Sequence, residues 1–306
     1  MHITTNKTLA TLLWPLIKVT EYLGVHHPEL LIKFRYLARF GHLPNLKDPK
    51  DLNEKILHQK LYSDISTWAI LADKYAVREY IKKCGLEDIL IPLYGAWSDE
   101  NDIDFTTLPN KFILKANNGD GKGSFKVVKD NKSADHDALR VLAGKWLRIK
   151  NIGALGAEPQ YRKIPPKVIA EQFLESGDSP FPTDYKIWCL NGEPYAILTC
   201  ADRTTSKLTL GIYDTEWNWI PNALRETGSY LIAPNPIERP HCLEEMLDIA
   251  RTLAKPFPQV RVDLYEVNGK VYFGELTFTS LGGMMNYFTP DFLLKMGEKV
   301  SLDYGK

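Results

Sequence analysis

Hydrophobic residues recur at helical spacing through the first part of the chain. Leucine and isoleucine positions lie three or four residues apart near the start, namely Leu9, Leu12, Leu13, Leu16, Ile17 and Leu23. This spacing places them on one face of a helix. Further along, Asp51 can cap another helix, and Glu54 completes the capping-box pattern three residues later. We therefore predict a helical region over residues 1–66.

The pattern changes after residue 66. One more helix is expected from Trp68 to Lys83, and a later one from about His241 to Leu253. Between and after them, short β-branched segments alternate with turn residues: "ILIPLYGAW", "KFILKANN", "KVIAEQFL", "DYKIWCLNGEPYAILTCADR" and "VRVDLYEVNGKVYFGELTF". Because these strands are not regularly separated by helices, the pattern predicts an α+β fold with antiparallel sheets rather than βαβ winding.

The last of these segments predicts a hairpin with one acid in each arm, Asp263 and Glu275. A two-residue turn at Asn268 and Gly269 would send the two acids to opposite faces. A three-residue loop with a left-handed Gly269 puts both on one face, with Arg261 opposite Glu275, and collects the aliphatic residues on the other. We adopt the second register, which places the two acids on a diagonal roughly 7 Å apart at Cβ. In that register the acidic face carries Arg261, Asp263, Tyr265, Phe273, Glu275 and Thr277.

Two carboxylates at that distance repel each other unless a cation lies between them. Oxygen ligands of this kind favour Mg²⁺ over Zn²⁺. The alternative is a half-exposed hairpin on which Asp263 and Glu275 simply face water.

Composition narrows the function classes. The 306 residues allow about two domains. Lys plus Arg and Asp plus Glu both number 38, so the zero formal charge gives no general attraction to nucleic acid or to a membrane. Four scattered cysteines without a CxxC pair suit a reducing compartment, and the absence of HExxH spacing argues against zinc.

The apolar run from Leu9 to Ile17 is too short to span a bilayer and is interrupted by Pro15. It has neither a basic leader nor a small-residue cleavage site, so we expect no signal peptide. We expect a cytoplasmic protein, in which this run forms a packed helix face. The alternative is a peripheral contact with the inner face of the cytoplasmic membrane or with polysaccharide assembly machinery.

"FILKANNGDGKGS" predicts a strand ending in Lys115 and a glycine loop. Gly119, Gly121 and Gly123 at alternate positions let backbone N–H groups approach an anion, and Lys122 adds positive charge. The loop fits neither the P-loop nor the GxGxxG pattern. A flexible hairpin tip would show the same composition.

In their order along the chain, these segments resemble the ATP-grasp superfamily. More closely, the chain is similar to its teichuronopeptide-biosynthesis branch, found in bacterial surface-polysaccharide gene clusters. The resemblance runs from about Lys33 to Pro290. It is carried by "KFRYLARFGHLP", "ADKYAVREYI", "LKANNGDGKGS", "DYKIWCLNG", "VRVDLY" and "YFGELTF".

The resemblance implies an ATP site. Lys74 and Lys115 would hold the ATP phosphates, Asp184 the ribose hydroxyls, and Lys186 would point along its strand toward phosphate. The lid over the triphosphate would include Asn117, Gly119, Gly121, Gly123 and Ser124. The linker between two lobes would pair with adenine through Glu171, Gln172, Phe173 and Leu174, with Glu171 accepting from the exocyclic amine. The lobes would cover residues 67–168 and 169–306, after the helical region.

The resemblance also implies a metal and acceptor site. Asp263 and Glu275 would bind Mg²⁺, together with Thr277, where the superfamily usually has asparagine. A hydroxyl is a poorer ligand, which puts a second Mg²⁺ in question. Three residues would be catalytic, with Arg261 steadying the transferred phosphoryl group: Arg261, Lys186 and Arg203. Candidates for binding an anionic sugar or the acyl oxygen are Arg35, Arg39, His42, Arg203, Gly282 and Gly283; solvated helix charges are the alternative for the first three.

The activity implied is an ATP- and Mg²⁺-dependent carboxylate–amine ligase. It would join an amino acid or other amine to a hexuronic acid of a surface polysaccharide or of its sugar-nucleotide precursor, through an acyl phosphate. One alternative is an ATP-grasp kinase that phosphorylates a sugar or polyol hydroxyl. Another is a non-catalytic nucleotide-binding protein of a glycan-assembly complex.

Overall fold

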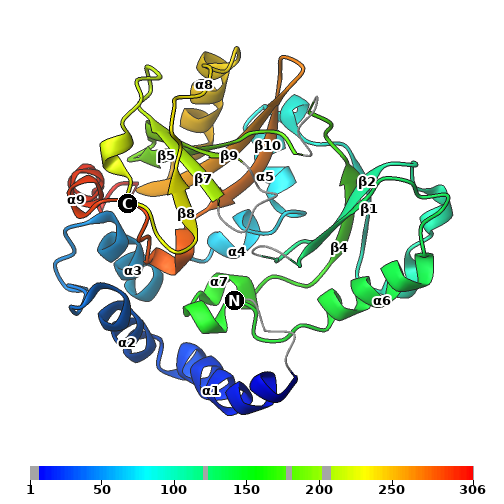
Figure 1. The fold of residues 1–306 in the computed structure, drawn as a ribbon, viewed down its shortest axis with the longest axis horizontal. Coiled ribbons are helices and arrows are strands. Elements are labelled where there is room, and N and C mark those ends of the chain that lie inside the picture. Colours follow the sequence, from blue (N-terminus) through cyan, green and yellow to red (C-terminus); the bar gives the residue numbers. More distant parts are fainter. Residues whose placement is uncertain (1–6, 120–122, 177–180, 202–207, 306) are drawn as a thin grey trace.

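The computed structural model describes residues 7–119, 123–176, 181–201 and 208–305 (Figure 1). Its helices are α1 (Lys7–His26), α2 (Pro28–Phe40), α3 (Leu52–Tyr62), α4 (Trp68–Leu71), α5 (Val77–Lys83), α6 (His136–Leu147), α7 (Pro159–Arg162), α8 (Leu243–Ala254) and α9 (Pro290–Lys299). Its strands are β1 (Leu93–Trp97), β2 (Phe112–Ala116), β3 (Phe125–Val128), β4 (Val168–Gln172), β5 (Asp184–Leu190), β6 (Glu193–Ala201), β7 (Leu208–Tyr213), β8 (Tyr230–Ile232), β9 (Gln259–Val267) and β10 (Lys270–Thr277).

A four-stranded antiparallel sheet in the order β1-β4-β2-β3 forms one part of the molecule. Helix α6 covers one of its faces (Figure 1). Leu114 of β2 and Ala170 of β4 are buried in the core beneath this helix. Because side chains alternate along a strand, Lys115 and Glu171 point to the opposite face.

A six-stranded sheet in the order β10-β9-β5-β6-β7-β8 forms the other part, antiparallel except between β7 and β8. It has a core on each face. Tyr185, Ile187 and Cys189 of β5 belong to the core under α8, the helix predicted near residues 241–253. Trp188 belongs to the core with α3 and α9. Asp184 and Lys186 share the Trp188 face, so that face is apolar at one end and charged at the other.

The observed strand pairing in the hairpin β9–β10 differs from the predicted register. Asn268 and Gly269 form a two-residue turn in which both φ angles are positive, 54° and 72°, as a type I′ turn requires. The acids nevertheless meet, because the pairing shifts by one residue at Gly274 and sets Glu275 directly opposite Asp263.

The shift at Gly274 also changes which residues share the acidic face. Arg261 pairs with Thr277, not with Glu275. Phe273 packs in the core under α8, and Tyr272 takes the place on the acidic face that was predicted for Phe273. The prediction of two acids on one face is therefore confirmed, although the predicted three-residue loop is wrong.

The helix predicted from Trp68 to Lys83 is interrupted. It divides into α4 and α5, and residues 72–76 form turns between them. Asp73 Oδ1 accepts hydrogen bonds from the Tyr75 amide at 2.8 Å and from the side chain of Asn117 at 2.9 Å. The Lys74 amide donates to the Asn117 carbonyl at 3.0 Å. These contacts with the strand end at residue 117 override the local helical preference.

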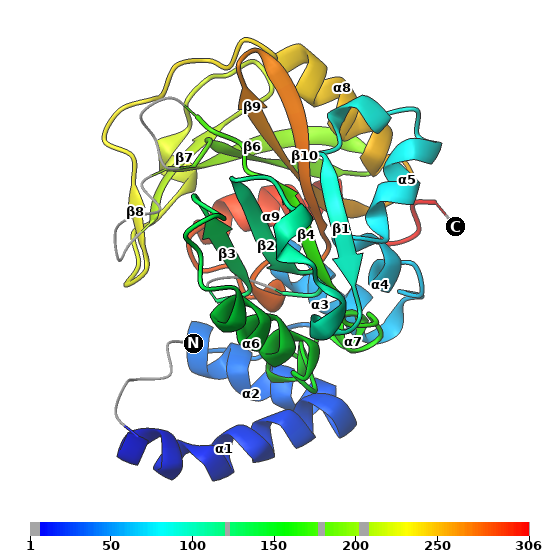
Figure 2. The same ribbon diagram turned by 90° about the vertical axis from the view of Figure 1, so that its right-hand side faces the viewer.

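Helices α1 and α2 lie at the end of the molecule opposite α8 (Figures 1 and 2). Helix α1 packs on α2 and on the short 3₁₀ helix η4 (Ala154–Gly156). A Cβ atom at Gly24 would lie 1.8 Å from the Ala154 carbonyl oxygen, so only glycine permits this close packing. Asp51 caps α3 as predicted, with its side chain accepting from the Glu54 amide at 2.9 Å. The proposed lobe boundaries remain predictions.

Candidate active site

The charged faces of the two sheets supply the candidate site. On the four-stranded sheet, Lys115 Nζ lies 2.9 Å from Glu171 Oε2. Arg78 of α5 lies 3.3 Å from the other oxygen of the same carboxylate. Glu171 is buried, so its charge requires these two cationic partners. Arg78 was not predicted to belong to this site, although it stands four residues after Lys74 in the "ADKYAVREYI" segment.

Lys74 connects the glycine loop to the acidic hairpin. Its Nζ donates to the Gly119 carbonyl at 2.6 Å and lies 3.6 Å from Glu275 Oε2. The turn between α4 and α5 holds the backbone of Lys74 against residue 117, and this fixes where the side chain begins. Lys74 therefore contacts the loop that follows the strand carrying Lys115. Phosphate binding by the two lysines stays a prediction.

Strand β5 contributes Asp184 and Lys186. Lys186 Nζ lies 2.6 Å from Asp184 Oδ2 and also donates to Asp263 of β9. Burial opposes the charge on Lys186, but the two carboxylates outweigh it and raise the pKa of this lysine above its ordinary value. Lys186 is thus a permanent cation at the centre of the acidic face.

Arg261 organises the acids of the hairpin. Its Nε and Nη2 donate to the two oxygens of Asp263, each at 2.7 Å. Nη2 also donates to Thr277 Oγ1 at 3.0 Å and to Glu275 Oε1 at 3.3 Å, and Nη1 donates to Ser280 Oγ at 2.7 Å. Because its guanidinium is committed to these partners, Arg261 positions the acids rather than reaching outward to a phosphoryl group.

Glu275 is the accessible acid of the pair. Its side chain is 38% exposed, whereas that of Asp263 is 2% exposed. Burial opposes ionisation of Glu275, but Lys74, Lys186 and Arg261 together lower its pKa to about 2. The carboxylate is therefore charged across the physiological pH range.

This donor set fits a Mg²⁺ ion that is shared with phosphate. Mg²⁺ is commonly held by one or two carboxylates while phosphate oxygens and water complete its shell. Glu275 offers such an oxygen directly, whereas Asp263 could join only if Arg261 or Lys186 released it. Thr277 Oγ1 donates to Glu275 Oε1 at 3.1 Å and thereby orients it. Among the described residues no group of three or more His, Cys, Asp and Glu side chains forms a metal site by itself.

The predicted lid is described only in part. Gly121 lies outside the described residues. A Cβ atom at Gly119 would lie 2.1 Å from Ser124 Cβ, and Gly123 has a φ of 99°, so both positions require glycine. Asn117 is completely buried, and its amide group bonds with Asp73, Pro165 and Lys167. Asn117 therefore anchors the base of the loop instead of facing a nucleotide.

The first two residues of the predicted adenine linker, Glu171 and Gln172, end β4, and Phe173 and Leu174 follow the strand. The Gln172 amide donates to the Pro92 carbonyl at 2.9 Å. Leu174 is buried with Ile91 and Val267, and the Phe173 ring lies edge-on to Phe181 at 6.4 Å between centroids. These residues form an apolar surface beside Glu171, whose carboxylate is engaged with Lys115 and Arg78.

A loop beside the acids is held by the N-terminal helices. Leu281, Gly282 and Gly283 in η6 (Ser280–Gly283) all have positive φ angles, of 46°, 67° and 79°. Arg39 Nη1 donates to the Met284 carbonyl at 2.9 Å. Lys60 Nζ donates to the Gly282 carbonyl at 2.8 Å.

Lys60 was not predicted to have a role at this site. It is 4% exposed and also donates to the Gly156 carbonyl at 3.0 Å. Burial lowers its pKa to about 8, partly opposed by Glu158 and assisted by Arg35. The sequence held a signal for it, because Lys60 stands three and four residues after Leu57 and Ile56 on an apolar helix face.

The remaining predicted acceptor residues are dispersed. Arg35 is half-buried and donates to the Leu155 carbonyl. His42 is exposed, and its ring contacts Tyr36 at 5.4 Å between centroids. Arg203 lies outside the described residues. The structure therefore brings Arg39, but not His42, to the loop at residues 280–284.

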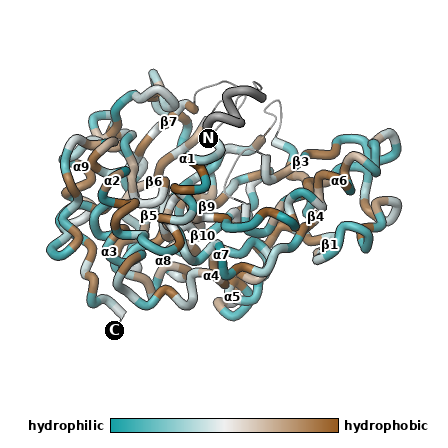
Figure 3. Tube along the Cα trace, turned by 90° about the horizontal axis from the view of Figure 1, so that it is seen from below, coloured by the Kyte–Doolittle hydropathy of each residue, from teal (hydrophilic) through white to brown (hydrophobic). Residues whose placement is uncertain are grey.

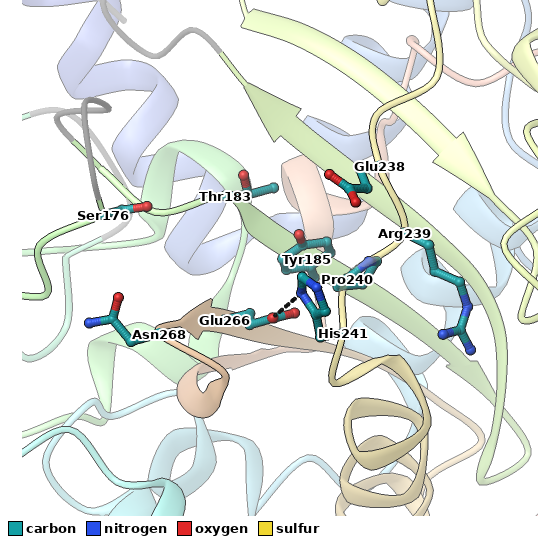
Figure 4. Close-up of a pocket in the computed structure, with 9 residues that line it drawn as sticks. All are labelled: Ser176, Thr183, Tyr185, Glu238, Arg239, Pro240, His241, Glu266 and Asn268. Carbon is teal, nitrogen blue, oxygen red and sulfur yellow. Dashed lines mark ion pairs between the residues drawn. The ribbon is translucent and has the colours of Figure 1, made fainter.

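A separate pocket of about 190 Å³ lies on the other side of β5 (Figure 4). Tyr185, Glu266 and His241 line it, and His241 Nδ1 lies 3.4 Å from Glu266 Oε1. Because Tyr185 points away from the face that carries Asp184 and Lys186, this pocket is not the candidate active site.

Comparison with known proteins agrees with the fold. Paired lysines, a glycine loop and an acidic hairpin on two antiparallel sheets define the ATP-grasp class. A family model described as TupA-like ATPgrasp matches residues 54–301. The chain therefore belongs to the TupA-like ATP-grasp family, whose matched region begins after α1 and α2. Members of the superfamily are generally ATP-dependent ligases. The resemblance inferred from the motifs is confirmed.

Several solved structures are similar at low sequence identity. The D-alanine–D-alanine ligase from Bacillus anthracis is 17% identical, with a TM-score of 0.46 over 76% of this chain and 68% of that one. The enzyme of the same name from Helicobacter pylori is 18% identical, with a TM-score of 0.43 over 82% and 70%. The ATP-grasp ligase PsnB, in complex with a minimal precursor, is 13% identical, with a TM-score of 0.41 over 77% and 61%. No match was found among curated protein sequences.

Proposed function

We propose that the protein is an ATP- and Mg²⁺-dependent ligase that joins an amine to a carboxylate. The observation that carries this proposal is the placement of Lys74 between the Gly119 carbonyl and Glu275, at 2.6 and 3.6 Å. A triphosphate lying beside this lysine would also be within reach of the exposed carboxylate of Glu275, which can share a Mg²⁺ ion with it.

The proposed reaction has two steps. An acceptor carboxylate oxygen attacks the γ-phosphorus of ATP, which forms an acyl phosphate and releases ADP. The amine then attacks the acyl carbon, which forms an amide and releases phosphate. Mg²⁺ would supply charge neutralisation on the triphosphate. Lys74, Lys115 and Lys186 would bind the phosphate oxygens and stabilise the charge that develops on them.

The acceptor is proposed to be a hexuronic acid of a bacterial surface polysaccharide or of its precursor, and the amine an amino acid or a similar compound. Support comes from the family resemblance and from Arg39, which lies beside the 280–284 loop and can pair with a carboxylate. In that loop Leu281, Gly282 and Gly283 have positive φ angles, and a backbone of this kind can offer an N–H group to an anionic oxygen.

The test is a mass-spectrometric screen of uronic acids against amines with ATP and Mg²⁺. We expect an amide product and ADP only when both substrates are present. ADP formation with a polyol and no amine would replace this proposal with a kinase. ATP binding without turnover over the whole screen would instead indicate a non-catalytic nucleotide-binding protein.

A further inference from the structure

Exposed hydrophobic side chains are concentrated on the N-terminal helices. Of the 18 large hydrophobic residues that are exposed among those whose burial the structure describes, eight lie between residues 14 and 43, a tenth of the chain. They are Trp14, Leu16, Val19, Tyr22, Leu30, Phe34, Leu37 and Leu43. Such a concentration is typical of an interaction surface rather than of the scattered apolar residues on any protein surface.

The solvent side of each helix is apolar in a regular pattern. On α1, Trp14 and Tyr22 are eight residues apart and therefore lie on the same face, 58% and 57% exposed. On α2, Leu30, Phe34 and Leu37 follow one another at intervals of four and three residues. Leu31, Ile32 and Tyr36 fill the opposite, buried side of α2. Helix α2 thus has apolar side chains on both its buried and its exposed side.

Helix α8 shows the contrasting pattern at the other end of the molecule. Its outward residues are charged, among them Glu244, Glu245, Asp248 and Arg251. The outward side of α8 is therefore polar, whereas the outward sides of α1 and α2 carry several apolar side chains. Figure 3 looks onto the end that carries α1 and shows hydrophobic stretches along both helices.

The charge of the same segment identifies the partner. Residues 1–43 contain five Lys or Arg residues and two Asp or Glu residues. The rest of the chain contains 33 Lys or Arg residues and 36 Asp or Glu residues. The segment thus carries a formal charge of +3 in a chain whose total is zero. Lys18 lies 4.6 Å over the Trp14 ring and pairs with Glu21 at 2.8 Å, and Lys33 of α2 pairs with Glu29 at 2.6 Å. The excess positive charge is therefore that of Lys7, Arg35 and Arg39. A second copy of the chain would bring like charges together across a two-fold interface, whereas an anionic lipid surface complements them.

We propose that the outward faces of α1 and α2 bind the surface of an anionic lipid bilayer. Tryptophan and tyrosine side chains prefer the boundary between headgroups and acyl chains, which suits Trp14 and Tyr22. Phe34 and its neighbours on α2 add apolar area that enters the same layer. The contact is peripheral, because no helix in the described part of the chain is long and hydrophobic enough to cross a bilayer. This inference does not depend on the proposed ligase activity.

The test is sedimentation of the full-length protein with unilamellar vesicles. Vesicles of phosphatidylcholine with phosphatidylglycerol are compared with vesicles of phosphatidylcholine alone. We expect binding to the anionic vesicles that weakens as salt is added. The double variant Trp14→Ser with Tyr22→Ser should lower the partition coefficient at least about tenfold, as should Leu30→Ser with Phe34→Ser. Lys18→Glu should weaken binding to anionic vesicles only.

The matched controls replace exposed hydrophobic residues elsewhere. Val141→Ser on α6 and Leu294→Ser on α9 should bind vesicles as the unmodified protein does. Failure of the unmodified protein to bind anionic vesicles would overturn the proposal. So would binding that survives both double variants. A concentration-dependent dimer that both variants abolish, without vesicle binding, would overturn it in favour of self-association.

Discussion

Lysine and carboxylate side chains in the candidate site are paired with one another, and the pairs indicate how each residue would act. Lys115 is held by Glu171, and Lys186 by Asp184 and Asp263. A triphosphate would compete with these carboxylates for the lysines. The lysines are therefore kept in place and charged before a nucleotide arrives, which is a form of preorganisation.

Lys115 should be indispensable for turnover. We expect Lys115→Ala to reduce kcat/KM for ATP by at least about a hundredfold, because the site loses one of the positive charges that bind the ATP phosphates. Lys111→Ala is the matched control, since Lys111 is an exposed lysine directly before the same strand and pairs with the exposed Glu175. ADP formation measured for both variants decides the matter, and a normal rate in Lys115→Ala would remove this residue from the site.

Arg39 should act on the acceptor rather than on ATP. We expect Arg39→Met to raise the acceptor KM by about tenfold or more, because a charge-assisted contact with the carboxylate is lost. ATP affinity should stay unchanged. Lys33→Met, six residues earlier on α2 and paired with Glu29, serves as the control. An unchanged acceptor KM would exclude Arg39 from acceptor binding.

Lys60 should give folding stability a pH dependence of defined sign. Its pKa falls from 10.5 unfolded to about 8 in the folded protein. Between those values the unfolded chain binds one more proton, so the contribution of Lys60 to the unfolding free energy becomes more favourable as pH rises. Glu158 and Arg35 are the charged groups that face it.

The comparison of Lys60→Met with the unmodified protein isolates this effect. Urea unfolding at pH 7 and pH 10 should show that the stability of the variant relative to the unmodified protein falls with rising pH. The change should be up to about 3 kcal/mol, the equivalent of the pKa difference. A stability difference that does not vary with pH would show that Lys60 is not the titrating group.

At the scale of a single element, the β9–β10 hairpin brings Asp263 and Glu275 to the same face. Its turn follows the simplest local rule, since Asn268 and Gly269 favour a type I′ turn. The acids reach one face through a bulge at Gly274, where a Cβ atom would lie 2.9 Å from the Asp263 carbonyl oxygen. A glycine within a strand is a signal for such a bulge.

Gly274→Val should separate the two acids. The added side chain would press on the backbone at Asp263, which we expect to destabilise the protein by roughly 1–3 kcal/mol and to weaken Mg²⁺-dependent ATP binding. Gly228→Val is the control, because a Cβ atom at Gly228 meets nothing within 4 Å. Urea unfolding and calorimetry measure the two effects. A Gly274→Val variant that binds MgATP normally would show that the bulge is not required.

The sequence patterns predicted the helices and strands better than the turns and breaks between them. The antiparallel sheets and the α8 helix followed from periodicity and from turn residues. The shared face of Asp263 and Glu275 was predicted from the wrong loop, because it depends on the bulge at Gly274. The break between α4 and α5 did not, because it depends on Asn117, more than 40 residues away, which donates a hydrogen bond to Asp73 and accepts one from the Lys74 amide. Long-range contacts of this kind leave no local pattern.

At the scale of the whole molecule, the N-terminal helices connect to the candidate site. Lys60 and Arg39 bond the loop at residues 282–284, more than 200 residues later in the chain. The side chain of Asn53 holds both backbone groups of Met285, at 2.9 and 3.0 Å. The helical region that precedes most of the family match therefore shapes the loop beside the acids. It also presents the apolar surface that we propose as a lipid-binding face.

Binding of ATP with and without Mg²⁺, measured by isothermal titration calorimetry, tests the central claim most directly. The claim is that Glu275, beside Asp263, shares a Mg²⁺ ion with a triphosphate held by Lys74 and Lys115. We predict that Mg²⁺ strengthens ATP binding to the unmodified protein and to the surface control Glu298→Gln, and that Glu275→Gln loses this gain. An ATP affinity that does not respond to Mg²⁺, or a gain that Glu275→Gln retains in full, would contradict the account.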